Sequence, residues 1–170
     1  MTYNTVTGEG ALTKKTKREI NENFDQVFGQ TVVQSANLVA NTETTLANLA
    51  GMAHNVVPGV YKFRIQLQVS ANGSAGTKAA IKQNDGATLD SISSMAEAYT
   101  ASAVAVTRTT STTDAASLVG ATAAHVLVVL EGTLTVATAG SLQLQAAQNA
   151  SHASDTTVFA GSTFELKRIG

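Results

Sequence analysis

The chain has 170 residues, a formal net charge of -1 and only 14% charged residues, well below the roughly 25% of an average soluble protein. This near-neutral balance provides no global attraction for nucleic acid or for an anionic membrane surface. There is no cysteine, which excludes disulfides, a thiolate nucleophile and a Cys-based zinc site. A hydrophobic content of 44% can supply the core of one compact domain with a small appendage.

The first residues carry no targeting signal. Met1 to Gly8 lack the basic and apolar regions of a secretory signal peptide. The strongest unbroken apolar run, Val126 to Leu130, is far too short to span a bilayer. We therefore expect a chain that folds in a cytoplasm and does not insert into a membrane.

Residues 1–12 are polar and contain glycine, and the next segment, Thr13 to Phe28, is predicted to be a helix. Thr16 and Glu19 have the spacing of a capping box, and Gly29 is a natural stop. A helix of this length is marginal in isolation, so its apolar stripe is expected to dock either on its own domain or on a partner. The residues of the stripe stand at i, i+4, i+7 and i+8: Ile20, Phe24, Val27 and Phe28.

The same helix carries a cluster of basic residues, Lys14, Lys15, Lys17 and Arg18. They could contact an acidic protein surface or DNA. Alternatively they belong to a solvated helix face, since Arg18 and Glu22 form an i,i+4 pair. Cations in the first turn oppose the helix dipole, which keeps an interaction role open. No aromatic residues are interleaved with the cluster, which disfavours binding of single-stranded nucleic acid.

From Thr31 onward the sequence predicts β-structure. In the clearest strand, Gly59 to Ser70, every odd position from Tyr61 to Val69 is apolar and the even positions are polar, as in a half-buried strand. About eight strands at short spacing predict an antiparallel β-sandwich of jelly-roll type. The expected strands are Thr31–Asn37, Thr45–Leu49, Gly59–Ser70, Thr77–Gln83, Leu89–Tyr99, Ala101–Thr109, Ala124–Thr138, Gly140–Gln148 and Val158–Ile169.

The segment that begins at Val126 has an unusual pattern. Its even positions up to Val136 are mostly apolar, and the same parity resumes after Gly140, which predicts the two arms of a β-hairpin. The odd positions Leu127 and Val129 are also apolar. A strand that is apolar on both faces is expected to be buried twice, once in its own core and once against another copy of the chain. The predicted subunit interface is Val126, Leu127, Val128, Val129 and Leu130.

Residue types that support catalysis or metal binding are scattered along the chain. The sequence has no nucleophile elbow, phosphate-binding loop or His-Glu-x-x-His motif. His54, His125 and His152 are far apart and lack ligand spacing. His125 could titrate at a subunit interface, although a histidine at a strand edge is the simpler interpretation. We therefore expect no catalytic residue, no metal and no cofactor, and a protein that is not an enzyme.

Two C-terminal segments, Val129 to Asn149 and Gly161 to Gly170, resemble the C-terminal half of small phage virion proteins. The second segment matches a family ending of Gly-Ser, alternating apolar residues, Arg, an apolar residue and Gly. Residues 31–170 are similar to the jelly-roll domain of the tumour-necrosis-factor and C1q-like proteins. Lys17 to Phe24, with its Asn-x-x-Phe motif, resembles the helical start of phage tail and head-fibre proteins.

The resemblance implies a homotrimer located on a phage virion, as a capsid decoration or head-fibre protein. Its expected partners are two further copies of itself and the major capsid protein or another virion protein. Residues 31–170 would form the trimerisation domain, and residues 1–30 would attach it to the virion. The aromatic content of 5% is lower than in receptor-type relatives, so aliphatic packing would have to form the trimer axis. The residues expected in the virion anchor are Lys14, Lys15, Lys17, Arg18, Ile20, Phe24, Val27 and Phe28.

The alternative is a tail-fibre or adhesion module that recognises a receptor or glycan on the host surface. Its binding loops would be Ala71–Gly76, Thr110–Asp114 and Asn149–Asp155, since loops on a rigid sandwich commonly carry binding sites. A jelly-roll enzyme of the cupin type is disfavoured, because it would need a His/Glu metal cluster that the sequence does not show.

Overall fold

The computed structural model describes residues 29–100, 103–111, 115–121 and 126–170. This part of the chain is built from β-strands and contains no helix, which confirms the prediction of a mainly β protein. The helix expected over Thr13–Phe28 lies outside the described residues, as does each residue of the expected virion anchor. The strands are β1 (Gln30–Val33), β2 (Leu38–Ala40), β3 (Ala47–Val56), β4 (Gly59–Ser70), β5 (Thr77–Asn84), β6 (Thr88–Tyr99), β7 (Val104–Ser111), β8 (Ala115–Ala121), β9 (Leu127–Thr138), β10 (Gly140–Gln148), β11 (Thr156–Val158) and β12 (Thr163–Arg168).

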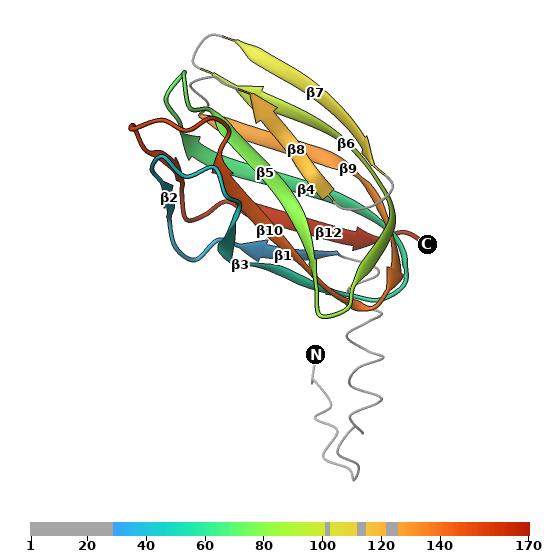
Figure 1. Cartoon of the computed structure of the whole chain (residues 1–170). Helices are drawn as coiled ribbons and strands as arrows, with labels where there is room; N and C mark the ends of the chain where they lie inside the picture. The colour runs from blue at the N-terminus through green and yellow to red at the C-terminus, as the bar shows by residue number, and fades with distance from the viewer. Residues whose placement is uncertain (1–28, 101–102, 112–114, 122–125) are drawn as a thin grey trace, which may run out of the picture.

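The strands form two antiparallel sheets that face one another (Figure 1). The large sheet has the order β1-β12-β4-β9-β6-β7, and the short strands β11 and β2 extend it beside β4. The small sheet has the order β3-β10-β5-β8. Consecutive strands often belong to different sheets, so the chain crosses repeatedly between the two layers.

The core lies between the sheets and is made by alternate residues of each strand. On β4 the five odd positions from Tyr61 to Val69 are all buried, whereas Lys62, Arg64 and Gln68 are exposed. This is the alternation predicted for Gly59–Ser70, and the strand has the predicted bounds. Removal of this apolar surface from water is the main favourable contribution to folding.

The predicted hairpin between the last two long strands is wrong. β9 pairs with β4 and β6 in the large sheet, whereas β10 pairs with β3 and β5 in the small sheet. Only Ala139 separates the two strands, and Gly140 makes the crossing possible. A Cβ atom there would lie 2.3 Å from the backbone nitrogen of Ala87 and 2.7 Å from the carbonyl oxygen of Asn84. Strands that face one core from opposite sheets show the same alternation as hairpin arms, so periodicity alone does not distinguish them.

Several strand limits also differ from the prediction. β3 continues to Val56, beyond the expected end at Leu49, and the short strands β2 and β8 were not expected. The strand expected over Val158–Ile169 is divided into β11 and β12. A turn separates them, with Gly161 at φ +92°, a left-handed conformation that favours glycine.

Candidate functional site

The outer face of the large sheet, which points away from the core, carries an apolar area over β6, β7 and β9. In the strand register Tyr99 lies between Val104 and Leu127, and the next row places Glu97 between Val106 and Val129. Val104 and Val106 are 52% and 57% exposed. We call this area the apolar patch and define it by its residues: Met95, Tyr99, Val104, Val106, Leu127 and Val129.

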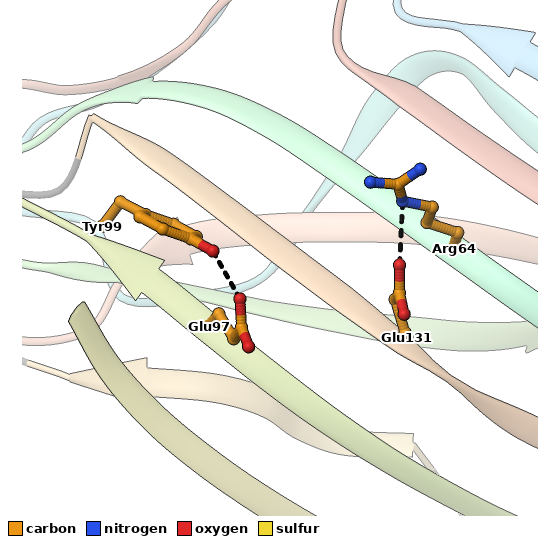
Figure 2. Close-up of polar contacts among 4 residues, drawn as sticks. All are labelled: Arg64, Glu97, Tyr99 and Glu131. Atoms are coloured by element: carbon orange, nitrogen blue, oxygen red, sulfur yellow. Dashed lines mark hydrogen bonds and ion pairs between the residues drawn. The ribbon is translucent and has the colours of Figure 1, made fainter.

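The patch ends at a row of charged residues. Met95, which is 38% exposed, has Glu131 as its register partner on β9 and Arg108 as its partner on β7. Glu131 in turn forms an ion pair with Arg64 of β4, with 2.9 Å between Nε and Oε1 (Figure 2). Both side chains are about half exposed, so the pair contributes little to stability. It defines the polar side of the patch.

Glu97 lies inside the patch and is hydrogen-bonded on its own strand. The hydroxyl of Tyr99 donates a hydrogen bond to the Glu97 carboxylate, and both side chains project from β6 on the same face (Figure 2). This hydrogen bond raises the pKa of Tyr99, and partial burial and the negative charges of Glu97 and Glu131 act in the same direction. Glu97 is thus a carboxylate that accepts a hydrogen bond from a neutral phenol among apolar neighbours.

Beyond the ion pair the outer face is polar. A shallow hollow of about 330 Å³ lies over β1, β12, β4 and β9, and charged side chains contribute much of its lining. Lys62 and Lys167 are direct register partners there, next to Arg64 and Glu165. The outer face therefore combines an apolar patch at one side with a solvated, mixed-charge surface at the other.

The residues predicted as a subunit interface divide between two environments. Val128 and Leu130 are fully buried in the core of their own chain, so their side chains cannot contribute to a contact with a second copy. Leu127 and Val129 project to the outer face and are half-buried. Val126 was expected to face the core together with Val128 and Leu130, but it precedes β9 and is 53% exposed. Of the five residues predicted for the subunit interface, Val126, Leu127 and Val129 are therefore the ones whose side chains are accessible, and their contact with a second copy stays a prediction.

The rest of the patch was not expected from the sequence. Val104 and Val106 come from β7 and Met95 and Tyr99 from β6, which are remote in sequence from Leu127. Their common location depends on which strands are neighbours, and that information is absent from the alternation within each strand. One feature of the sequence does indicate the patch: the outward-facing residues of β6 are serines at Ser91 and Ser93 and larger side chains from Met95 onward.

Two of the three loops predicted for host recognition lie together at one end of the sandwich. The backbone nitrogen of Ala150 donates a hydrogen bond to the carbonyl oxygen of Ala75, at 2.9 Å, which joins Asn149–Asp155 to Ala71–Gly76. The buried Gln148 orders the first of these loops, because its Nε2 donates to the carbonyl oxygens of His152 and Ser154. The third loop, Thr110–Asp114, lies partly outside the described residues.

The two described histidines, His54 and His152, occupy different parts of the fold. His54 is buried on β3, with Nε2 2.9 Å from the carbonyl oxygen of Phe164 and its ring edge-on to the Phe164 ring at 4.6 Å. His152 belongs to a surface loop, and His125 lies outside the described residues. Within residues 29–100, 103–111, 115–121 and 126–170, no group of three or more His, Asp or Glu side chains could hold a metal ion. The same part of the chain contains no helix long and apolar enough to cross a membrane.

The structure thus offers a surface and a loop cluster as candidate sites. Comparison of the sequence with protein-family models and with curated proteins finds no match.

Proposed function

We propose that the chain is a structural protein of a phage virion, a homotrimeric capsid decoration or head-fibre protein anchored by residues 1–30. The observation that carries the proposal is the apolar patch, because it gathers exposed apolar side chains from three neighbouring strands on a sheet face that points away from the core. The resemblance of Val129–Asn149, Gly161–Gly170 and Lys17–Phe24 to phage virion proteins supports the location on a virion. The chemistry of such a protein is binding rather than catalysis.

The strand order supports a jelly-roll domain. When β2, β11 and the β6–β7 hairpin are set aside, eight strands remain in chain order: β1, β3, β4, β5, β8, β9, β10 and β12. When these eight strands are numbered from 1 to 8 along the chain, their order is 1-8-3-6 in the large sheet and 2-7-4-5 in the small sheet. This is the order of strands in a jelly roll, an eight-stranded double sheet with two Greek keys. The β6–β7 hairpin would be an insertion that widens the large sheet and carries four of the six residues of the patch.

The occupant that fits the patch is a second copy of the chain. Strand spacing and rise give the six positions of the patch an area of roughly 200 Å², whereas a stable interface needs about 800 Å² from each partner. The patch would therefore be the apolar centre of a larger contact, with the solvated part of the outer face as its polar rim. That rim carries both signs of charge, with Lys62 and Arg64 beside Glu131 and Glu165, so it offers opposite charges to the side chains of a neighbouring copy.

A closed trimer would also explain how a weak anchor could suffice. In a closed ring every copy of the chain makes the same contacts with its neighbours. Three N-terminal segments would then reach one particle together. Multivalency of this kind raises overall affinity well above that of one segment, without any new contact.

The test of attachment uses purified protein and empty phage shells. Deletion of residues 1–30 is expected to abolish binding to shells while the β-domain keeps its circular dichroism spectrum and its native mass. A matched protein with Lys14, Lys15, Lys17 and Arg18 all changed to Gln separates the contribution of charge from that of the apolar stripe. Undiminished binding of the deleted protein would place the anchor elsewhere.

A second candidate function is host recognition, and the joined loops at the end of the sandwich favour it. Asn149–Asp155 and Ala71–Gly76 form one polar surface, held by the Ala150 to Ala75 hydrogen bond. Incubation with host cells in parallel with empty shells distinguishes the two functions. Binding to cells that is lost on replacing Ala71–Gly76 with a shorter turn would favour adhesion, whereas binding to shells alone would favour decoration.

A further inference from the structure

Asn72 is the only asparagine of the chain that is followed by a glycine. Together with Gly73 and Ser74 it forms the exposed tip of the loop Ala71–Gly76. An asparagine in this sequence is prone to lose its side-chain amide, because the next backbone nitrogen can attack the side-chain carbonyl carbon and glycine has no side chain to hinder the attack. The loop therefore carries a sequence in which a covalent change requires only water.

The backbone of the loop holds Asn72 in place and leaves the attacking nitrogen unbonded. The carbonyl oxygen of Asn72 accepts hydrogen bonds from the backbone nitrogens of Ala75 and Gly76, at 3.0 and 2.9 Å. The backbone nitrogen of Ser74 donates to Oδ1 of Asn72 at 2.8 Å, and this bond would stabilise the oxyanion that attack on the side-chain carbonyl creates. The backbone nitrogen of Gly73 donates no hydrogen bond within the part of the chain that the structure describes.

Two other asparagines at the same end of the sandwich lack this combination. Asn149 is followed by Ala150, whose backbone nitrogen donates to the carbonyl oxygen of Ala75 at 2.9 Å. Asn41 is followed by Thr42, whose backbone nitrogen donates to a carbonyl oxygen of the neighbouring loop at 3.0 Å. A nitrogen that is already hydrogen-bonded must break that bond before it attacks, and a side chain on the same residue hinders it further. The local structure therefore distinguishes Asn72 from asparagines close by.

We propose that Asn72 is a site of spontaneous deamidation, through a succinimide formed with Gly73. The Gly73 nitrogen gives its proton to hydroxide and bonds to Cγ of Asn72, while the bond from Cγ to Nδ2 breaks and ammonia leaves with a proton taken from water. Water then opens the ring. Addition at Cγ gives aspartate at position 72, and addition at the backbone carbonyl gives isoaspartate, in which the main chain runs through the former side chain.

Isoaspartate at position 72 would release the loop from its neighbour. The carbonyl group that accepts from Ala75 and Gly76 would become a free carboxylate, and the main chain would be lengthened by a methylene group. Ala75 is fully buried, and its carbonyl oxygen holds the backbone nitrogen of Ala150. Loss of the turn is therefore expected to displace Ala75 and to free that nitrogen. Aspartate adds a negative charge to the loop but keeps the turn.

The experiment incubates the purified full chain in its native state in mildly alkaline buffer, where hydroxide speeds the first step, and then maps its peptides by mass spectrometry. The amide should be replaced by a carboxyl group in the peptide that contains Asn72, with release of ammonia, and should be kept at Asn41 and Asn149. Gly73→Ala is the matched variant, because Gly73 does not have a positive φ and alanine fits that backbone, whereas its methyl group hinders the attack. This variant should keep the amide over the period in which most of the wild type loses it.

Hydrogen exchange at the backbone amide of Ala150 tests the release of the loop. Exchange should be faster in protein that carries isoaspartate than in fresh wild type, and unchanged in freshly prepared Asn72→Asp, which adds the charge without lengthening the main chain. Equal exchange in the isoaspartate protein would overturn the release of the loop. The modification itself is overturned if the native wild type keeps the amide as long as Gly73→Ala does, or if Asn41 and Asn149 convert as fast as Asn72.

Discussion

The ring of Phe63 lies over Gly132, its register partner on the neighbouring strand. A Cβ atom built on Gly132 would be 2.9 Å from two atoms of that ring and 2.1 Å from the carbonyl oxygen of Ser93. Phe63 is among the largest fully buried side chains of the core. The absence of a side chain at position 132 therefore makes room for the ring between β9 and the facing sheet.

Gly132→Ala is expected to destabilise the fold by about 1–3 kcal/mol, the usual cost of overpacking a well-filled core. The backbone oxygen of Ser93 cannot move without disturbing the β6–β9 ladder, so the clash is not relieved by a side-chain rotation. Urea unfolding measures the change. Thr133→Ala, on the exposed face of the same strand, is the control and should alter stability by less than about 0.5 kcal/mol. Equal midpoints for the two variants would contradict this account.

His54→Ala is expected to destabilise the fold by about 2–4 kcal/mol, since it removes a buried ring and its hydrogen bond. The ring packs edge-on against Phe164 and its Nε2 bonds to the Phe164 carbonyl oxygen, so it connects β3 of the small sheet to β12 of the large sheet. Thermal unfolding near neutral pH checks the effect. His152→Ala, in a surface loop, should cost less, and a larger loss there than at His54 would refute the assigned role.

The hydroxyl of Tyr99 is expected to ionise above the ordinary tyrosine pKa of about 10, first because of its hydrogen bond to Glu97. The folded chain then holds this proton more tightly than the unfolded chain. The stability that this hydrogen bond contributes is complete below the pKa of Tyr99 in the unfolded chain. It is lost as the pH rises through the pKa of Tyr99 in the folded chain. Near-ultraviolet titration of the wild type against Tyr99→Phe isolates the signal. Glu97→Gln should lower the pKa of Tyr99, and no change in that variant would argue against the hydrogen bond as its cause.

The sequence predicted β4 well because Pro58 precedes it and because one of its faces is in the core and the other in water, which produces clean alternation. It predicted β6 less clearly, since the register shift between Leu89 and Ser91 brings Leu89 and Ile92, three positions apart, to the same buried face. Periodicity could not predict which strands pair with β9 and which pair with β10. The same limit applies to the patch. Leu127 and Val129 were recognised as outward-facing apolar residues, but their neighbours on β6 and β7 follow only from the strand order.

Leu127→Asp is expected to dissociate the assembly, because it would place a charge in the apolar centre of the interface while the core is left unchanged. The change should appear as loss of native mass with a retained circular dichroism spectrum. Val39→Asp is the matched control, since Val39 is 55% exposed on β2, away from the patch. An intact assembly with Asp at position 127 would show that the apolar patch is not the contact surface.

The central claim, that the outer face of the large sheet holds copies of this chain together, is tested most directly by the mass of the native particle. Sedimentation equilibrium of the full chain at micromolar concentration should give close to three times the 17.5 kDa of one chain. The mass should be maintained in high salt, because an apolar centre is not screened. A stable species of 17.5 kDa under these conditions would contradict the account.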